Sequence, residues 1–225
     1  KYGIDALINE ANSKEGEFYE AAAIALSGVK ILIDRYLEII SEQKKTCSET
    51  RLAQLELLET SLKNIYGGGA NNLYEALQLY ILLWTVMCIE QAPNPYAFSV
   101  GNADRIFEPY RGELDRDEAA ELFKHFLVFY NVGDRSWAIS QNVLISGRDV
   151  DGNDLTNTMT YAIMDAYFDM NLPQPILSVK LHKNTPDTLY REMGRFFFSA
   201  GVLTPSLFND DAMFDVLERN GVERA

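Results

Sequence analysis

The side chains with the greatest capacity for catalysis or metal binding are two histidines and two cysteines. His182 follows an apolar run, so it could reach a ligand at a strand end, although a hydrogen bond to the following turn is the simpler interpretation. His125 lies in an apolar helical pattern, which favours a structural role. Cys47 falls in a polar connector and Cys88 in an apolar segment, without the electropositive surroundings of a reactive thiol. We therefore predict no catalytic residue and no metal site in this chain.

Three further groups have two interpretations each. Trp137 precedes a short β-prone run, where it would either wall a pocket or fill core space. Asn209-Asp210-Asp211 would form a polar cluster at a strand end, or equally a helix N-cap followed by first-turn acids. Gly67-Gly68-Gly69 does not follow a strand, so a flexible turn between helices is favoured over a phosphate-binding loop. Dinucleotide, P-loop, zinc-protease and nucleophile-elbow motifs are absent from the sequence.

The elements that would position these residues are mostly helices. The first long one is apolar nearly all round, which is typical of a buried helix. Short β-prone runs separated by long helices favour parallel strands joined by helical crossovers. The predicted helices span residues 18–40, 52–65, 73–89, 115–130, 155–170, from 185 to near 201, and a last one after 211; the predicted strands span 141–146, 176–181 and 203–208.

Composition narrows the class of protein. The 225 residues carry a net charge of −13, and no basic patch of a nucleic-acid-binding protein is visible. An anionic membrane surface would repel such a chain, and the apolar stretch Leu79–Ile89 is shorter than the about 20 residues that span a bilayer. We therefore expect no nucleic-acid partner and no membrane, and a cytoplasmic location. Composition and spacing alone indicate a soluble helical α/β domain and no particular reaction.

Three consecutive segments carry a more specific signal. They read QNVLISGRDVDGNDLTNTMTYAIMDA at residues 141–166, LPQPILSVKLHKNTPD at 172–187 and LTPSLFNDDAM at 203–213. In this order they resemble glycyl radical enzymes of the pyruvate formate-lyase superfamily. The upstream segments FYEAAAIALSGVKILIDRY, LYEALQLYILLW and SVGNADRIFEPY also fit, whereas IYGGGANN departs from the family pattern. The resemblance covers almost all of the chain.

The resemblance implies a mostly helical α/β fold. The family has a ten-stranded αβ barrel made of two half-barrels and surrounded by helices, and residues 1–225 would form part of such a domain. A glycine in the intact enzyme holds a stable radical, installed by a separate radical S-adenosylmethionine activase, and passes it to a cysteine inside the barrel. Cys47 and Cys88 do not align with that cysteine, so this chain would stop before both the thiyl cysteine loop and the glycyl radical loop. No other cofactor is expected, and the intact enzyme would be a homodimer.

The resemblance also suggests which residues line a substrate pocket. Trp137 matches a tryptophan beside the active site of pyruvate formate-lyase. Gln141, Asn142, Ser178 and His182 lie on strands that would face the barrel interior or its rim. We expect these five residues to line the pocket, and not to serve as acid, base or nucleophile.

The implied activity is cleavage of a carbon–carbon or carbon–heteroatom bond, or dehydration, of a small polar metabolite by thiyl-radical hydrogen abstraction in an anaerobe. The fragment alone would be inactive. The segment from Leu172 to His182 is slightly closer to the dehydratase and decarboxylase branch than to formate acetyltransferase proper, which stays an alternative. A catalytically dead, stand-alone helical scaffold or binding module is a second alternative, and an unrelated helical α/β domain without a half-barrel of strands is a third.

Overall fold

The computed structural model describes residues 2–90, 98–137 and 141–222, except the side chains of residues 133–137. The chain divides into two compact units, Lys1–Val86 and Met87–Ala225, which are described separately below. Four helices make up the first unit, with α4 extending past its boundary: α1 (Gly3–Asn12), α2 (Glu17–Lys44), α3 (Glu49–Ile65) and α4 (Leu73–Glu90).

The core of the first unit is aliphatic. Its buried side chains come from all four helices, which is why the helices pack on one another although each has polar residues elsewhere. The turn between α3 and α4 is held in place, because the Asp5 N–H donates to the Gly67 carbonyl at 3.0 Å. The prediction of an inter-helix glycine turn is thus confirmed, but the turn is bonded to α1 and not free. The core residues are Ile4, Val29, Ile33, Ile40, Leu55, Leu62, Ile65 and Leu82.

The prediction that α2 is buried on all sides is wrong. Val29 and Ile33 are buried, whereas Ile24 is 75% exposed and Ile31 is 55% exposed. Most contacts of α2 with other helices are with α1 and α3, and Ile24 and Ile31 lie outside them. Apolar composition alone could not tell which faces of a helix have neighbours.

Of the described helices, only α4 has the length and mean hydropathy, 1.3 over 18 residues, of a potential membrane span. It is longer than the apolar stretch Leu79–Ile89 from which the sequence argument excluded a span. Leu73, Leu82 and Trp84 of this helix are buried, whereas Met87 and Ile89 are exposed.

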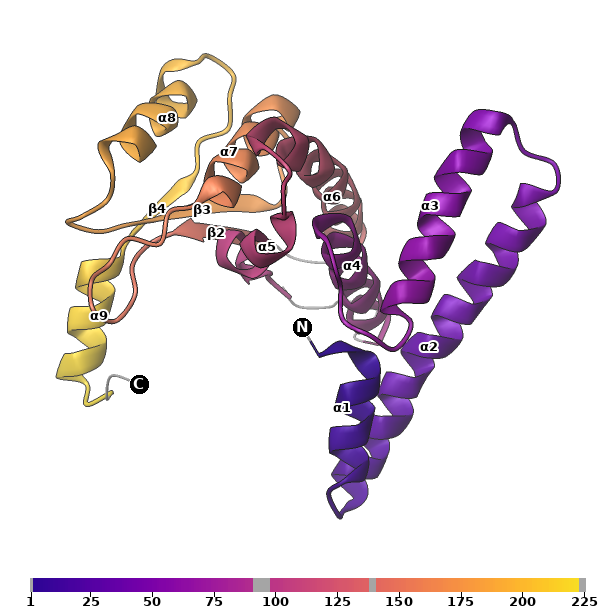
Figure 1. Ribbon diagram of the computed structural model, residues 1–225. Coiled ribbons are helices and arrows are strands. Elements are labelled where there is room, and N and C mark those ends of the chain that lie inside the picture. Colours follow the sequence, from indigo (N-terminus) through magenta and orange to yellow (C-terminus); the bar gives the residue numbers. More distant parts are fainter. Residues whose placement is uncertain (1, 91–97, 138–140, 223–225) are drawn as a thin grey trace. The chain divides into compact units, whose positions relative to one another are not determined.

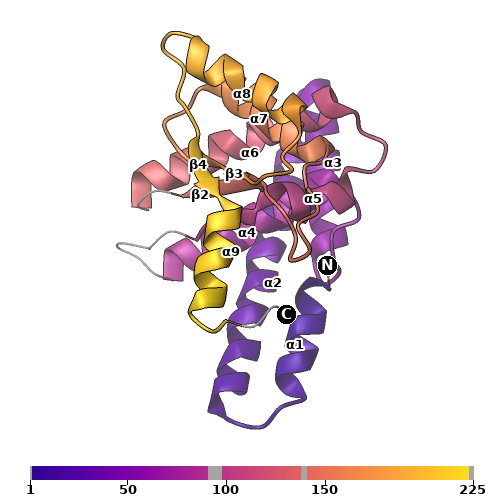
Figure 2. The same ribbon diagram turned by 90° about the vertical axis from the view of Figure 1, so that its left-hand side faces the viewer.

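The second unit is built around a parallel sheet. Its strands lie in the order β1-β2-β3-β4, and helices connect successive strands (Figures 1 and 2). The register places Leu144, Ser178 and Ser206 side by side on three neighbouring strands. The elements are β1 (Gly101–Asn102), α5 (Ala103–Arg111), α6 (Arg116–Trp137), β2 (Asn142–Ser146), α7 (Thr158–Met170), β3 (Ile176–Leu181), α8 (Asp187–Phe198), β4 (Ser206–Asn209) and α9 (Asp210–Arg219).

The predicted elements of this unit largely match the observed ones. β3 has the predicted bounds and β2 begins one residue later than predicted. The last strand, Ser206–Asn209, begins three residues later than predicted, directly after Pro205, and ends one residue later. The structure adds β1 and α5, which were not predicted. A strand of two residues has no alternation to detect, and Pro109 inside α5 is a sequence signal against a helix.

One face of the sheet is fully apolar. Val143 and Ile145 of β2 and Leu177 and Val179 of β3 point to this face and are completely buried, at 1% exposure or less. Tyr167 of α7 is buried, and its ring lies beside the ring of Phe196 in α8. Behind the sheet, α5 and α6 contribute a stack of aromatic rings, Phe107, Phe123, Phe126 and Tyr130. This core fixes the strands that carry the polar residues described below.

An ion-pair network holds α6, α7 and α8 together at their surface. Arg116 Nη2 lies 2.7 Å and Arg195 Nη1 lies 2.6 Å from Asp165 Oδ1. Burial pushes the pKa of Asp165 up, but the hydrogen bonds and charges of both arginines outweigh burial, so this pKa lies below its ordinary value of 3.8.

We expect Asp165→Asn to lower the free energy of unfolding by roughly 1 kcal/mol at neutral pH. Because the folded-state pKa is depressed, the contribution is fully present above the unfolded value of 3.8 and is lost as pH falls through the lower folded value. Urea unfolding between pH 7 and pH 2.5 should show the wild type and the variant converging below pH 4. Parallel pH profiles down to pH 2.5 would contradict the assignment.

Candidate functional site

A polar pair occupies the sheet face opposite the apolar one. Ser178 is 1% exposed, and its hydroxyl donates to Asn142 Oδ1 at 2.9 Å. The Asn142 N–H in turn donates to Ser99 Oγ at 3.0 Å. Because Asn142 Oδ1 accepts from Ser178, its Nδ2 group is directed elsewhere and is suited to donate to a polar ligand. Asn142 and Ser178 thus form a hydrogen-bonded polar pair on this face of the sheet.

His182 lies just past the end of β3 and is fixed through both ring nitrogens. The Asn184 N–H donates to Nδ1 at 3.3 Å, so the ring proton belongs on Nε2, which lies 3.0 Å from Asp154 Oδ1. The backbone N–H of His182 donates to Thr185 Oγ1 at 2.8 Å, and the His182 carbonyl accepts from the Thr185 N–H. These bonds confirm the interpretation of His182 as a partner of the following turn, and they leave its imidazole without a free basic nitrogen.

Asp104 connects α5, β2 and α7 from inside the protein. It is completely buried and accepts hydrogen bonds from the Ser146 N–H at 2.6 Å, the Thr160 hydroxyl at 2.7 Å and the Arg105 N–H at 2.8 Å. Burial raises the pKa of Asp104, and the three hydrogen bonds together with the Arg105 charge oppose that rise. This carboxyl group fixes the C-terminal end of β2 relative to two helices.

Three charged side chains converge over Gly147, the residue that follows β2. A Cβ built on Gly147 would lie 2.4 Å from Asp210 Oδ2, 2.9 Å from Lys180 Cε and 3.0 Å from Arg105 Nη2. Lys180 Nζ pairs with Asp210 Oδ2 at 3.5 Å, and Arg105 Nη2 donates to the Ser146 carbonyl at 2.9 Å. Burial and the neighbouring Arg105 charge lower the pKa of Lys180, while Asp210 raises it. The carboxyl ends of the parallel strands thus carry an internally paired charge cluster.

Asn209-Asp210-Asp211 is both the start of a helix and a polar cluster at a strand end, so both interpretations of this segment apply. Asn209 caps α9 by accepting from the Ala212 N–H at 3.0 Å. Asp211 accepts from the Lys183 N–H at 2.7 Å and pairs with Arg148 Nε at 2.7 Å. The segment is therefore a helix start whose acids also bind the ends of β2 and β3.

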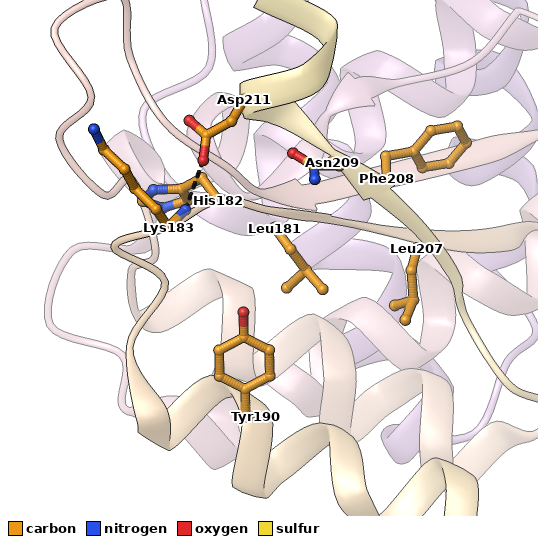
Figure 3. A pocket seen from close by; sticks show the side chains of 8 residues that line it. All are labelled: Leu181, His182, Lys183, Tyr190, Leu207, Phe208, Asn209 and Asp211. Atoms are coloured by element: carbon orange, nitrogen blue, oxygen red, sulfur yellow. Dashed lines mark hydrogen bonds between the residues drawn. The ribbon is translucent and has the colours of Figure 1, made fainter.

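A cavity of about 470 Å³ opens between β3, β4 and α8. Figure 3 shows Leu181, Leu207 and Tyr190 directed toward a common space and Phe208 directed away from it. Leu181 is three residues from Ser178 in the same strand, so the two side chains point to opposite faces of the sheet. The cavity is lined by Leu181, His182, Lys183, Tyr190, Leu207, Phe208, Asn209 and Asp211.

The five predicted pocket residues do not meet at this cavity. Only His182 lines it, whereas Asn142 and Ser178 form their pair on the other sheet face. Gln141 is completely buried, and its Oε1 accepts from the Tyr130 hydroxyl at 3.2 Å. Trp137 is the last residue of α6, and its side chain lies outside the described residues. The role of all five in a pocket stays a prediction.

The charge cluster was missed by sequence reasoning. Arg105 lies in α5, a helix that was not predicted, and the strand position of Lys180 gives no sign of its partners. Gly147 directly after a strand, together with the acids at 210–211, was the signal available. Among the described residues, no group of three or more histidine, cysteine or acidic side chains could hold a metal ion.

Sequence and structure comparisons identify the family. A family model for pyruvate formate lyase-like proteins matches residues 1–225. The chain belongs to the pyruvate formate lyase-like family. Its predicted resemblance to glycyl radical enzymes and its predicted fold class, a mostly helical α/β part of their barrel, are confirmed.

Three known proteins illustrate this membership. The (2S)-3-sulfopropanediol dehydratase of Klebsiella oxytoca is 27% identical over 225 residues, which cover 92% of this chain and 27% of the relative. The trans-4-hydroxy-L-proline dehydratase of Clostridioides difficile is 27% identical over 236 residues, covering 94% of this chain and 29% of the relative. A glycyl radical enzyme from Archaeoglobus fulgidus has the same fold, with a TM-score of 0.85 at 22% identity, over 99% of this chain and 32% of that one.

This pyruvate formate lyase-like chain thus spans between a quarter and a third of the length of the proteins that it matches. The two cysteines of the sequence do not lie on the sheet, because Cys88 is buried in α4 and Cys47 follows α2. The described residues contribute a parallel sheet with a polar face, and the chemistry of such an enzyme would require residues beyond those of this sheet.

Proposed function

We propose that this chain forms part of a glycyl radical enzyme that dehydrates a small polar metabolite, or cleaves a C–C or C–heteroatom bond in it. The observation that carries the proposal is the family match along the whole chain, supported by the parallel sheet with its polar Asn142–Ser178 face. In such an enzyme, a thiyl radical removes a hydrogen atom from the substrate. Residues 1–225 would bind and enclose the substrate and would be inactive alone.

The residues of this chain would act by positioning. Ser178 orients the Asn142 amide, which would then donate a hydrogen bond to a hydroxyl or carbonyl group of the substrate. His182 and Asp154 would keep the rim of the sheet in one conformation. Trp137 would complete the lining of the pocket, and Gln141 would support it from the core through its bond to Tyr130. Excluding water and oxygen from the radical is the second role of such a lining.

Dehydration is favoured over formate acetyltransferase activity. Two relatives that match more than nine-tenths of this chain are named as dehydratases, and the substrates in their names carry hydroxyl groups. Neutral amide and hydroxyl side chains on the sheet face suit hydroxyl groups as hydrogen-bonding partners. We further propose that the intact enzyme is cytoplasmic, homodimeric, and activated by a radical S-adenosylmethionine enzyme that installs the glycyl radical.

The proposal is tested by turnover of the intact protein, activated anaerobically, on (2S)-3-sulfopropanediol, trans-4-hydroxy-L-proline and glycerol. With whichever substrate reacts, Ser178→Ala is expected to raise KM about fivefold to tenfold, with a smaller change in kcat, because the Asn142 amide loses its fixed orientation. Ser41→Ala, at the exposed end of α2, serves as the control and should match the wild type. An unchanged KM in Ser178→Ala would contradict a role of Asn142 and Ser178 in substrate binding.

A further inference from the structure

Asn142, the first residue of β2, has a hydrogen-bonding partner on each of its two sides. β2 lies between β1 and β3 in the sheet. On the β3 side, the Ser178 hydroxyl bonds to the Asn142 side chain at 2.9 Å. On the other side, Ser99, two residues before β1, accepts from the Asn142 backbone N–H at 3.0 Å. Ser178 is buried, Asn142 is half-buried and Ser99 is exposed, so this chain of bonds runs from the interior to the surface.

The directions of these bonds leave hydrogen-bond donors without acceptors. Asn142 Oδ1 accepts from Ser178, so the unused hydrogens of the amide are those on Nδ2. Ser99 Oγ accepts from the Asn142 N–H, which leaves the proton of its own hydroxyl to donate. Among the described residues, neither Asn142 Nδ2 nor the Ser99 hydroxyl has an acceptor. The two side chains can therefore donate to an acceptor group of a ligand.

A single buried tyrosine holds the backbone next to both residues. The Tyr130 hydroxyl lies 2.8 Å from the Phe98 carbonyl oxygen and 3.2 Å from Gln141 Oε1. Phe98 directly precedes Ser99, and Gln141 directly precedes Asn142. Because Tyr130 is completely buried, it anchors both segments to the core. Donors on an anchored backbone lose less conformational entropy when they bind a ligand.

We propose that Ser99 is a further substrate-binding residue, and that its hydroxyl acts together with the Asn142 amide. Both would donate to a substrate group whose oxygen atoms carry no proton, such as a carboxylate, a sulfonate or a carbonyl. A substrate hydroxyl satisfies this pair less well, because its own proton would need an acceptor. The inference rests on the proposed function, since it requires the polar sheet face to line the substrate cavity. It adds to that function a residue and a preferred class of substrate group.

Steady-state kinetics of the intact, activated protein test the role of Ser99. With whichever of the three compounds used for the proposed function reacts, Ser99→Ala should raise KM about threefold to tenfold and change kcat less than twofold. Ser99→Thr retains the hydroxyl and should restore the wild-type KM. Ser41→Ala, a serine substitution at the exposed end of α2, is the control. A purely structural role of Ser99 would instead lower the urea midpoint and leave KM unchanged.

Asn142→Asp tests the polarity of the site. The introduced carboxylate has the shape of the amide and can still accept from the Ser178 hydroxyl, but it has no hydrogen to donate. Because it would face an acceptor oxygen of the substrate, we expect KM to rise about thirtyfold. A substrate that donated a hydroxyl proton to this position would instead bind the variant as tightly as the wild type.

The outcomes separate this inference from the proposed function. A glycyl radical doublet and wild-type turnover, combined with an unchanged KM in Ser99→Ala, would overturn the role of Ser99 alone. An unchanged KM in Asn142→Asp, or turnover of glycerol but of neither compound that carries a carboxylate or a sulfonate, would overturn the preference for an acceptor group. A wild type that forms no doublet and turns over none of the three compounds would contradict the proposed function, and this inference with it.

Discussion

Asp104→Ala is expected to lower the free energy of unfolding by roughly 3–5 kcal/mol, the largest effect of any single substitution considered for this chain. The carboxylate is completely buried and accepts from the Ser146 N–H and the Thr160 hydroxyl. Without it, these two donors and the Arg105 N–H lose their carboxylate acceptor inside the protein. Chemical unfolding in urea, followed by circular dichroism, measures the loss.

Thr160→Val is the matched control for this prediction. It removes one of the three donors to Asp104 and preserves the shape of the side chain, so we expect a loss of only about 1–2 kcal/mol. If Asp104→Ala were no more destabilising than Thr160→Val, the carboxylate would not be the group that joins β2 to α7.

Gly147→Ala should cost about 2–4 kcal/mol of stability for two separate reasons. The residue has a φ of +95°, which a side chain disfavours. The added methyl group would also displace Asp210 and Arg105 from the positions in which they bind the Arg148 N–H and the Ser146 carbonyl. The change is measured as the shift of the urea midpoint.

Gly152→Ala separates these two causes. Gly152 has a similar φ of +87°, but a Cβ there would meet nothing within 4 Å. Gly152→Ala should therefore lower the free energy of unfolding only through backbone strain, by about 1 kcal/mol. Equal losses in the two variants would mean that the charge cluster over Gly147 rearranges without cost.

Much of the second unit could be predicted from sequence because its signals are local. The alternation at Ile176–Leu181 gave β3 with its bounds, and Asp115 with Glu118 gave the start of α6, where the Asp115 carboxylate accepts from the Glu118 N–H at 2.9 Å. By contrast, β1 and α5 depend on contacts with β2 and α7 that have no signature in their own residues. Pairing with a neighbour, and not propensity, decides such short elements.

The candidate site was harder to predict than the fold. Parity along a strand could place Asn142 and Ser178 on one face, and their hydrogen bond agrees with that placement. The convergence of Arg105, Lys180 and Asp210 over Gly147 depends on three crossover connections that bring the strand ends together. The exposure of Ile24 and Ile31 on α2 was missed for the same reason, because burial is a property of neighbours and not of composition.

We propose that residues 1–225 line part of the substrate cavity of a glycyl radical enzyme. Electron paramagnetic resonance of the intact protein, after anaerobic treatment with its activase and S-adenosylmethionine, tests it most directly. We expect the doublet signal of a glycyl radical in both the wild type and the Ser178→Ala variant. Ser178 would help to bind the substrate and would not contact the glycine that carries the radical. A fully reduced, folded protein that develops no such doublet under these conditions would contradict the claim.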